Sequence, residues 1–258
     1  SSDVCSSDLL IALATLAAAT SAFAQSSVTL YGNLDVSFGR EQSKPFGEKS
    51  TTVTNLESGR MTESYFGLRG SEDLGGGLKA VFKLESEIAV DSGAAVGGNS
   101  NFFGRNAYVG VAGDFGAVHA GRRESLLKEE TTKFNPFGNS GTFAFLSAGN
   151  DSWSNSLTYV SPSLGGLTLS AQTSLKEANG TTATNYRSGG NAVSANYTAG
   201  ALALSAVFSD VRNTQGAATN VKDSGYLLGA SYDLSVVKVF GQYGRDKISV
   251  KNVNGDGK

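Results

Sequence analysis

The stretch that decides the fold is Tyr65–Ile88, YFGLRGSEDLGGGLKAVFKLESEI, which reads as two strands joined by a glycine-rich turn. In its second half the residues of one parity are apolar, namely Leu78, Ala80, Phe82, Leu84 and Ile88. The residues of the other parity are charged, apart from Val81, and they are Lys79, Lys83, Glu85 and Glu87. Successive side chains of a strand point to opposite faces. The stretch therefore predicts an antiparallel hairpin with one oily face and one charged face.

The length of the second strand limits what its oily face can contact. About ten residues are needed to cross a bilayer as a tilted strand, whereas a strand of a soluble protein is more often about five or six residues long. The oily face therefore either packs on a core or faces lipid, and the pattern of the remaining sequence is needed to distinguish these two alternatives.

The composition is typical of a β-rich chain and excludes several classes of function. The 258 residues include 33 glycines and 3 prolines, and the net charge of −2 offers no basic surface for a nucleic acid. With one cysteine and one histidine, the chain cannot form an internal disulfide or a metal site built from several such side chains. Most histidine-dependent catalysis is excluded for the same reason. We expect no enzymatic activity, no metal and no cofactor.

The first part of the chain resembles an export signal. Leu9–Ala19 is an apolar run too short to span a membrane as a helix, and Ala22-Phe23-Ala24 fits a signal-peptidase site. We therefore predict a signal peptide over residues 1–24 and a mature domain over residues 25–258. Residues 1–8 contain neither an initiator methionine nor a basic residue, so we expect that they are not the native start. No later segment approaches the roughly 18 apolar residues of a transmembrane helix.

Alternation of apolar and polar residues recurs along the mature chain and predicts about 11 strands, from Val28–Phe38 to the region of Val236–Asp246. It predicts no amphipathic helix. Short turns are expected at Ser71–Gly77, Gly113–Gly116, Ser161–Gly166, Thr198–Gly200 and around Leu234-Ser235. Long polar connections are expected at Arg40–Thr62, Ala89–Asn101, Glu124–Ser152, Glu177–Gly190 and Ser209–Ser224. Short turns that alternate with long loops are typical of an outer-membrane β-barrel, so we predict an all-β, antiparallel transmembrane barrel.

Several motifs resemble those of the Gram-negative general porins of the β-proteobacterial (Burkholderia/Neisseria-like) type. They are Ser26–Gly32, Gly67–Gly75, Phe103–Gly110, Asp114–Gly116, Gly121-Arg122, Asn155-Ser156 with Tyr159, and Ser161-Pro162. The resemblance covers Gln25 to about Val160 and continues more loosely beyond. It implies a homotrimeric barrel of about 16 strands in the outer membrane, whose third loop folds into the pore. It also implies passive diffusion of ions and small hydrophilic solutes.

Two features depart from the family pattern. About 11 strands are too few for that barrel, and a C-terminal strand with a terminal aromatic residue is absent. We therefore expect a C-terminally truncated fragment that forms a curved open sheet with edges near Val28 and Val239. The basic wall of the pore is also thinner, because Tyr65 and Ser152 stand where the family commonly has arginine. An anion preference is therefore not carried over.

The resemblance places the constriction in the loop Glu124–Asp151, where Lys128 and Lys133 accompany the acids. The predicted pore-lining residues of this loop and the wall opposite it are Tyr65, Arg69, Lys83, Glu85, Arg105, Arg122, Arg123, Glu124, Glu129, Glu130, Asp151 and Ser152. Of the two adjacent arginines, we expect one to face the lumen. Acids that face bases at close range would set a transverse field, and arginine keeps its charge in such a site. For each of these charges, plain solvated surface is the alternative.

Apolar side chains in this region allow further expectations. Phe134–Gly138 is apolar for an exposed loop, which packing against the inner wall or a small local cluster would explain equally. Trp153, Leu157 and Tyr159 share a parity, and we place them on the lipid face, where the two aromatics would suit an interfacial girdle. His119 is expected to be an ordinary wall residue.

Two other functions remain open at this point. One is an outer-membrane barrel that acts as an adhesin or structural protein, and the other is a secreted soluble β-protein or glycan-acting enzyme. The single histidine and the lack of a concentrated carboxylate pair argue against the enzyme. The expected partners are outer-membrane lipid, further copies of the chain, and small hydrophilic solutes and ions, with no nucleic acid.

Overall fold

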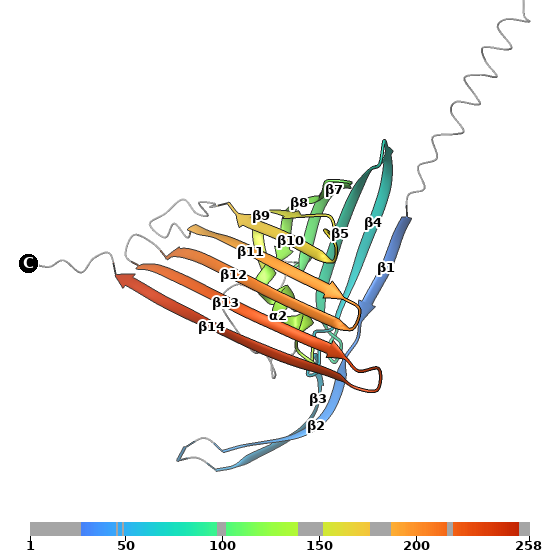
Figure 1. The fold of residues 1–258 in the computed structure, drawn as a ribbon. Coiled ribbons are helices and arrows are strands. Elements are labelled where there is room, and N and C mark those ends of the chain that lie inside the picture. Colours follow the sequence, from blue (N-terminus) through green and yellow to red (C-terminus); the bar gives the residue numbers. More distant parts are fainter. Residues whose placement is uncertain are drawn as a thin grey trace, which may run out of the picture.

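The structure, a computed structural model, describes residues 27–44, 46–47, 49–96, 102–138, 152–175, 187–215 and 219–252. The predicted signal peptide and Asp151 lie outside these ranges. Figure 1 shows a curved antiparallel sheet with one helix against its concave side.

One 12-stranded sheet forms most of the described chain, and all of its pairings are antiparallel. Eleven of these strands follow one another in space in chain order. They are β1 (Ser27–Asn33), β4 (Tyr65–Gly75), β5 (Leu78–Ala89), β7 (Asn106–Gly113), β8 (Gly116–Glu124), β9 (Ser152–Val160), β10 (Leu167–Ser174), β11 (Arg187–Ala199), β12 (Leu202–Gln215), β13 (Thr219–Asp233) and β14 (Lys238–Asn252). The short strand β6 (Ala94–Ala95) pairs only with β5. The predicted number of strands is therefore confirmed, and β1 and β14 are the two edges of an open sheet, as expected.

The hairpin β4–β5 is antiparallel as predicted, and its glycine turn falls within the predicted Ser71–Gly77, although β4 continues to Gly75. Arg69 lies opposite Lys83, and the register shifts between Asp73 and Gly75. The side chain of Asp73 accepts a hydrogen bond of 2.8 Å from the backbone N–H of Gly75. The three glycines of the turn, residues 75–77, all have positive φ, which side chains with a Cβ rarely adopt. Because this short turn lies at one end of the strands, the long connections lie at the other end.

The distribution of apolar and polar side chains between exposed and buried positions of the sheet is the reverse of that in a soluble protein. Large apolar side chains are exposed, for example Val28 at 64%, Leu30 at 70% and Val109 at 64%. The buried residues include many small polar side chains of the opposite parity, such as Thr158 and Ser205. An oily face that covers no core suits lipid and contradicts the alternative of a soluble protein built around that face.

The long connection after β8 contains a helix that the alternation pattern did not predict. It is α2 (Leu126–Lys133), and the side chain of Ser125 caps it by accepting the backbone N–H of Lys128 at 3.2 Å. Two turns are too few to show a clear helical period in a sequence. The helix is stabilised by packing, because its first two leucines belong to a buried cluster with the inner wall, consisting of Leu126, Leu127, Trp153, Ala192, Val207, Val211 and Leu227. No helix within the described residues is long and apolar enough to cross a membrane.

Trp153 is therefore not on the lipid face, and that prediction was wrong. Asn155 has a φ of 52°, and the pairing of β8 with β9 shifts register between Gly121 and Arg123. The extra residue on β9 reverses which parity faces inward. Trp153 is consequently 3% exposed, while Leu157 and Tyr159 are exposed as predicted.

The first predicted strand, Val28–Phe38, is also divided in two. β1 ends at Asn33, and β2 (Val36–Ser43) pairs with β3 (Thr51–Ser58) in a separate hairpin that stands off the main sheet in Figure 1. Asp35 lies at the break, where its carboxylate accepts the backbone N–H groups of Met61 and Thr62 at 2.6 and 2.8 Å.

The predicted long loop Ser209–Ser224 is mostly strand. β12 and β13 pair from Leu202 opposite Tyr232 to Gln215 opposite Thr219, so they extend well beyond the apolar pattern. The last strand, β14, likewise extends past Asp246 to Asn252.

Candidate functional site

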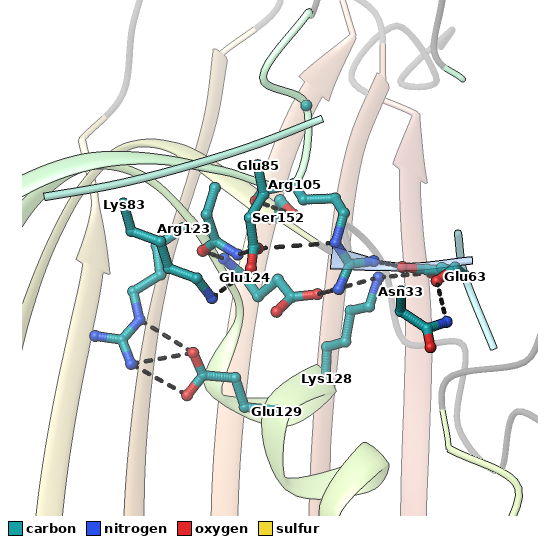
Figure 2. Close-up of polar contacts among 12 residues, drawn as sticks. Asn33, Glu63, Lys83, Glu85, Arg105, Arg123, Glu124, Lys128, Glu129 and Ser152 are labelled. Atoms are coloured by element: carbon teal, nitrogen blue, oxygen red, sulfur yellow. Dashed lines mark hydrogen bonds and ion pairs between the residues drawn. The ribbon is translucent and has the colours of Figure 1, made fainter. Parts of the chain in front are cut away.

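Arg105 is the centre of a charged cluster between the inner wall and α2 (Figure 2). Its guanidinium forms ion pairs with Glu63 and, at 3.1 Å, with Glu124. Its Nε lies 3.8 Å from a carboxylate oxygen of Glu85. Lys128 on α2 contacts Glu63 at 3.1 Å and Glu124 at 3.7 Å. The wall and the helix therefore share one network of alternating charge.

Glu85 is the most deeply buried acid of this wall, with 2% of its side chain exposed. One oxygen accepts the hydroxyl of Tyr31 at 2.6 Å and lies 2.9 Å from the ammonium of Lys83. The other oxygen accepts the side-chain amide of Asn106. These donors satisfy the carboxylate, as a buried charge requires.

A second arginine–carboxylate pair joins β8 to the helix. Arg123 donates to both oxygens of Glu129, at 3.0 and 3.2 Å, and its Nη1 lies 2.7 Å from Nδ1 of His119. Figure 2 shows this pair beside Lys83 on the same inner face. Two parallel contacts fix both the distance and the orientation of the helix.

Glu130 points the other way, into the wall. It is 1% exposed, and its carboxylate accepts hydrogen bonds of 2.9 Å each from Asn196 on β11 and Ser205 on β12. Gln172 on β10 holds the start of the helix, because its amide accepts from the backbone of Leu126 and donates to the backbone of Glu124. The helix is thus attached to both sides of the concave face.

The far end of the helix is fixed by shape. Phe134 is 4% exposed and lies over Gly229 of β13, where a Cβ would come within 2.4 Å of its ring. Gln242 of β14 donates to the backbone carbonyl of Thr131 at 2.9 Å. For Phe134, packing against the inner wall is the correct explanation of the apolar loop segment, while Phe137 is exposed.

Most of the predicted pore-lining residues meet in this cluster. The structure brings together Tyr65, Lys83, Glu85, Arg105, Arg123, Glu124, Glu129 and Ser152. The ring of Tyr65 lies under the guanidinium of Arg105, and the hydroxyl of Ser152 donates to the backbone carbonyl of Arg105 at 3.0 Å.

Three predicted residues lie elsewhere, and a fourth is not described. Arg122 points away from Arg123 and donates to the carbonyl of Gly104 and the hydroxyl of Ser154. Glu130 is buried and accepts hydrogen bonds from Asn196 and Ser205. Arg69 lies nearer the short turn, over the ring of Tyr31. Asp151 falls outside the described residues.

Sequence reasoning missed Glu63 and the polar partners Tyr31 and Asn106. Glu63 lies just before β4 and has the same parity as Tyr65 and Arg69. Glu63 could have been found by extending the alternation that contains Tyr65 and Arg69 one further position toward the N-terminus. The roles of Tyr31 and Asn106 depend on strand register, because they flank Glu85 from β1 and β7, and one sequence does not show that register.

The cluster holds equal numbers of opposite charges within the described residues. Its acids are Glu63, Glu85, Glu124 and Glu129, and its bases are Lys83, Arg105, Arg123 and Lys128. Each acid contacts at least one base. Such an arrangement braces a loop and sets up a short-range field, but it adds no net charge.

Comparison with known proteins gives a consistent result. Residues 10–258 match the family described as Gram-negative porin. Outer membrane porin protein 32 of Delftia acidovorans is 33% identical over 262 residues, which cover 96% of this chain and 71% of that protein. Major outer membrane protein P.IB of Neisseria meningitidis serogroup B is 32% identical over 193 residues, which cover 70% of this chain and 55% of that protein.

A solved structure agrees in fold. The anion-selective porin from Comamonas acidovorans superposes with a TM-score of 0.70 and 30% identity, over 88% of this chain and 69% of that one. The alignment with the Neisseria protein spans about half the length of that relative. The family match over residues 10–258 and the identity to a porin across nearly the whole chain show that this chain belongs to the Gram-negative porin family.

Proposed function

We propose that this porin lines a water-filled channel for passive diffusion of ions and small hydrophilic solutes, with α2 and the wall around Arg105 at its narrowest point. The family is one of outer-membrane channels rather than enzymes, which places the chain in the outer membrane of a Gram-negative bacterium. The exposed oily face is the surface that meets lipid. By the family resemblance, the working unit is a homotrimer.

The observation that carries this proposal is the attachment of α2 inside the curve of the sheet. Polar residues of β10, β11, β12 and β14 hold one side of the helix. On the other side Arg123 pairs with Glu129 of the helix, and Lys128 of the helix contacts Glu63 and Glu124, the two acids that Arg105 also binds. A helix that is fixed against the concave side of the sheet narrows any passage that the sheet encloses. Solutes that pass it meet the edge of the charged cluster, and size and charge then decide the rate.

Conductance of the full-length porin in a planar bilayer tests the proposal. We expect stepwise increases of current as single channels insert, and an adhesin or structural barrel would give none. Folding tests the soluble alternative separately. A folded monomer in buffer without detergent would contradict a lipid-facing role for the exposed apolar residues.

A further inference from the structure

A group of basic residues lies on the outward face of β12, β13 and β14, toward the strand ends that lead into the long connections. We call this group the outer basic patch, and its members are Arg212, Lys222, Arg245 and Lys247. On the outward face of these three strands, within the described residues, the one acid is Asp210. The patch therefore differs from the constriction cluster, in which acids and bases are equal in number.

Strand register places the patch on the same face as the oily residues. Arg212 pairs directly with Lys222, and Arg245 pairs directly with Tyr226. Residues that pair directly across antiparallel strands share a face, and their side chains lie close together. Lys222, Tyr226 and Leu228 have the same parity on β13, and Leu228 is 50% exposed on the oily face. The cations therefore continue the lipid-facing side of the sheet beyond its apolar part.

The position of the patch along the strands matches the level of lipid headgroups. Tyr226 and Tyr243 lie beside each other on this face with ring centres 6.2 Å apart, and aromatic residues are typical of the membrane interface. β13 has 15 residues, whereas about 9–11 cross the hydrocarbon core as a tilted strand, and Lys222 lies near the end opposite the short turn. Since short turns are periplasmic in such barrels, the patch lies at the outer leaflet.

Acids and bases are separated between the two faces at this level. Asp223 follows Lys222 in the sequence, and Asp246 follows Arg245. Their parity turns both acids to the inner face, where Asp223 is 7% exposed. A plainly solvated surface more often intersperses both signs. The outward face therefore carries an excess of positive charge that its sequence neighbours do not cancel.

Asp210 neutralises only part of this charge. Its carboxylate lies 2.7 Å from the ammonium of Lys222 and 3.5 Å from Nε of Arg212. Both cations remain accessible, because the side chain of Lys222 is 48% exposed and that of Arg212 is 65% exposed. Arg245 and Lys247 are exposed and have no carboxylate within 4.0 Å among the described residues. The patch can therefore accept further anionic groups from the lipid side.

We propose that the outer basic patch binds the phosphate groups of a phosphorylated glycolipid of the outer leaflet, lipopolysaccharide. A guanidinium fork matches two oxygens of a phosphate, and the two lysines supply compact charges beside it. Clustered basic residues at a membrane surface are typical of recognition of anionic lipid headgroups. The site lies on the outer surface of the barrel and does not depend on the channel function proposed above.

Binding of lipopolysaccharide to the full-length porin, freed of bound lipid and kept in detergent, tests the patch. A fluorescent form of the glycolipid is titrated with the unaltered protein and with variants. We expect Kd to rise about fivefold in Lys222→Gln or Lys247→Gln and about 25-fold in the double variant, as loss of one and two cations at an anionic surface would. Removal of the phosphates from the glycolipid should weaken its binding by a similar factor. Equal affinity of the unaltered porin for the two forms of the glycolipid would overturn the proposal.

Lys238→Gln is the matched control. Lys238 is an exposed cation on the same strand as Lys247, but it lies at the short-turn end of β14. An equal loss of affinity in Lys238→Gln and Lys247→Gln would show an effect of net charge and would contradict a localised site. Asp210→Asn provides a change of opposite sign, because it removes the acid of the patch. We expect tighter binding in Asp210→Asn, and weaker binding would count against the patch.

Competition separates the glycolipid from anionic lipids in general. Micelles of phosphatidylglycerol at the same phosphate concentration should displace little lipopolysaccharide, and complete displacement would overturn the assignment to the glycolipid. Circular dichroism of each variant excludes misfolding as the cause of lost binding. A porin that binds the glycolipid but passes no current contradicts the channel and leaves the patch standing.

Discussion

Arg105 lies over the ring of Tyr65, with its guanidinium carbon 4.5 Å from the ring centre. The same guanidinium is paired with Glu63 and Glu124. Tyr65 therefore serves the charged cluster without carrying a charge itself, because its ring supports Arg105.

The first prediction concerns this pair. Tyr65→Arg would put a second cation against Arg105, so we expect the reversal potential in a KCl gradient to move toward the chloride equilibrium potential. Tyr65→Phe keeps the aromatic face and should leave the potential unchanged. A Tyr65→Arg channel with unaltered ion preference would show that this position lies outside the ion path.

The second prediction concerns Glu85, which faces two cations from a buried position. Glu85→Gln removes the negative charge and keeps most of the shape, so Lys83 and Arg105 would be less neutralised. We expect a shift of the reversal potential toward anion preference and a lower temperature of unfolding in detergent, since a broken buried ion pair typically costs about 3–5 kcal/mol.

Glu72→Gln is the control for this change. It removes the same charge, and Glu72 is exposed near the short turn. If both variants shift the potential equally, the net charge of the chain rather than the buried acid sets the preference.

The third prediction concerns the attachment of α2 by Glu130. Glu130→Ala leaves Asn196 and Ser205 without their acceptor, at a cost of about 1–3 kcal/mol for buried donors. We expect a noisier open current and faster protease cleavage within the connection between β8 and β9, because the helix is released from one wall.

Lys133→Ala provides the comparison. Lys133 also contacts Glu130, at 2.8 Å, but its side chain is 52% exposed, and such ion pairs contribute little. Quiet current in both variants would mean that Leu126, Leu127 and Phe134 hold the helix without the carboxylate.

The outward face could be predicted from the sequence because lipid demands the same kind of residue at every second position. Alternation in Leu202–Phe208 and Tyr226–Tyr232 therefore gave both the strands and their exposed sides. The inner face is not required to carry the same kind of residue at every second position. One bulge at Asn155 was enough to move Trp153 from the predicted lipid face to the packing beneath α2.

Strand ends and side-chain partners were less predictable for a related reason. Backbone pairing of β12 and β13 continues where apolar residues stop, and Lys222 contacts Asp210 at 2.7 Å across them. Polar residues there look like a loop in the sequence. Glu63 and Glu130 show the same limit, since the register and the path of the loop decide that one joins Arg105 and the other anchors the helix.

The fourth prediction concerns the contact of Phe134 with Gly229, which fixes the far end of α2. A Cβ at Gly229 would lie 2.4 Å from Cδ2 of the ring, well inside van der Waals contact. Gly229→Val should therefore displace Phe134 and the end of the helix toward the lumen. We expect a lower single-channel conductance, because the displaced helix narrows the passage.

The double variant Gly229→Val with Phe134→Ala tests whether the contact itself is responsible. Removal of the ring makes room for the valine, so the conductance should return toward that of Phe134→Ala alone, and the two changes should be strongly non-additive. Gly241→Val is the matched single change, because the structure shows nothing within 4 Å of a Cβ at Gly241. A similar loss of conductance in Gly241→Val would trace the effect to valine in a strand rather than to the helix, and additive effects of the pair would contradict the wall contact of Phe134.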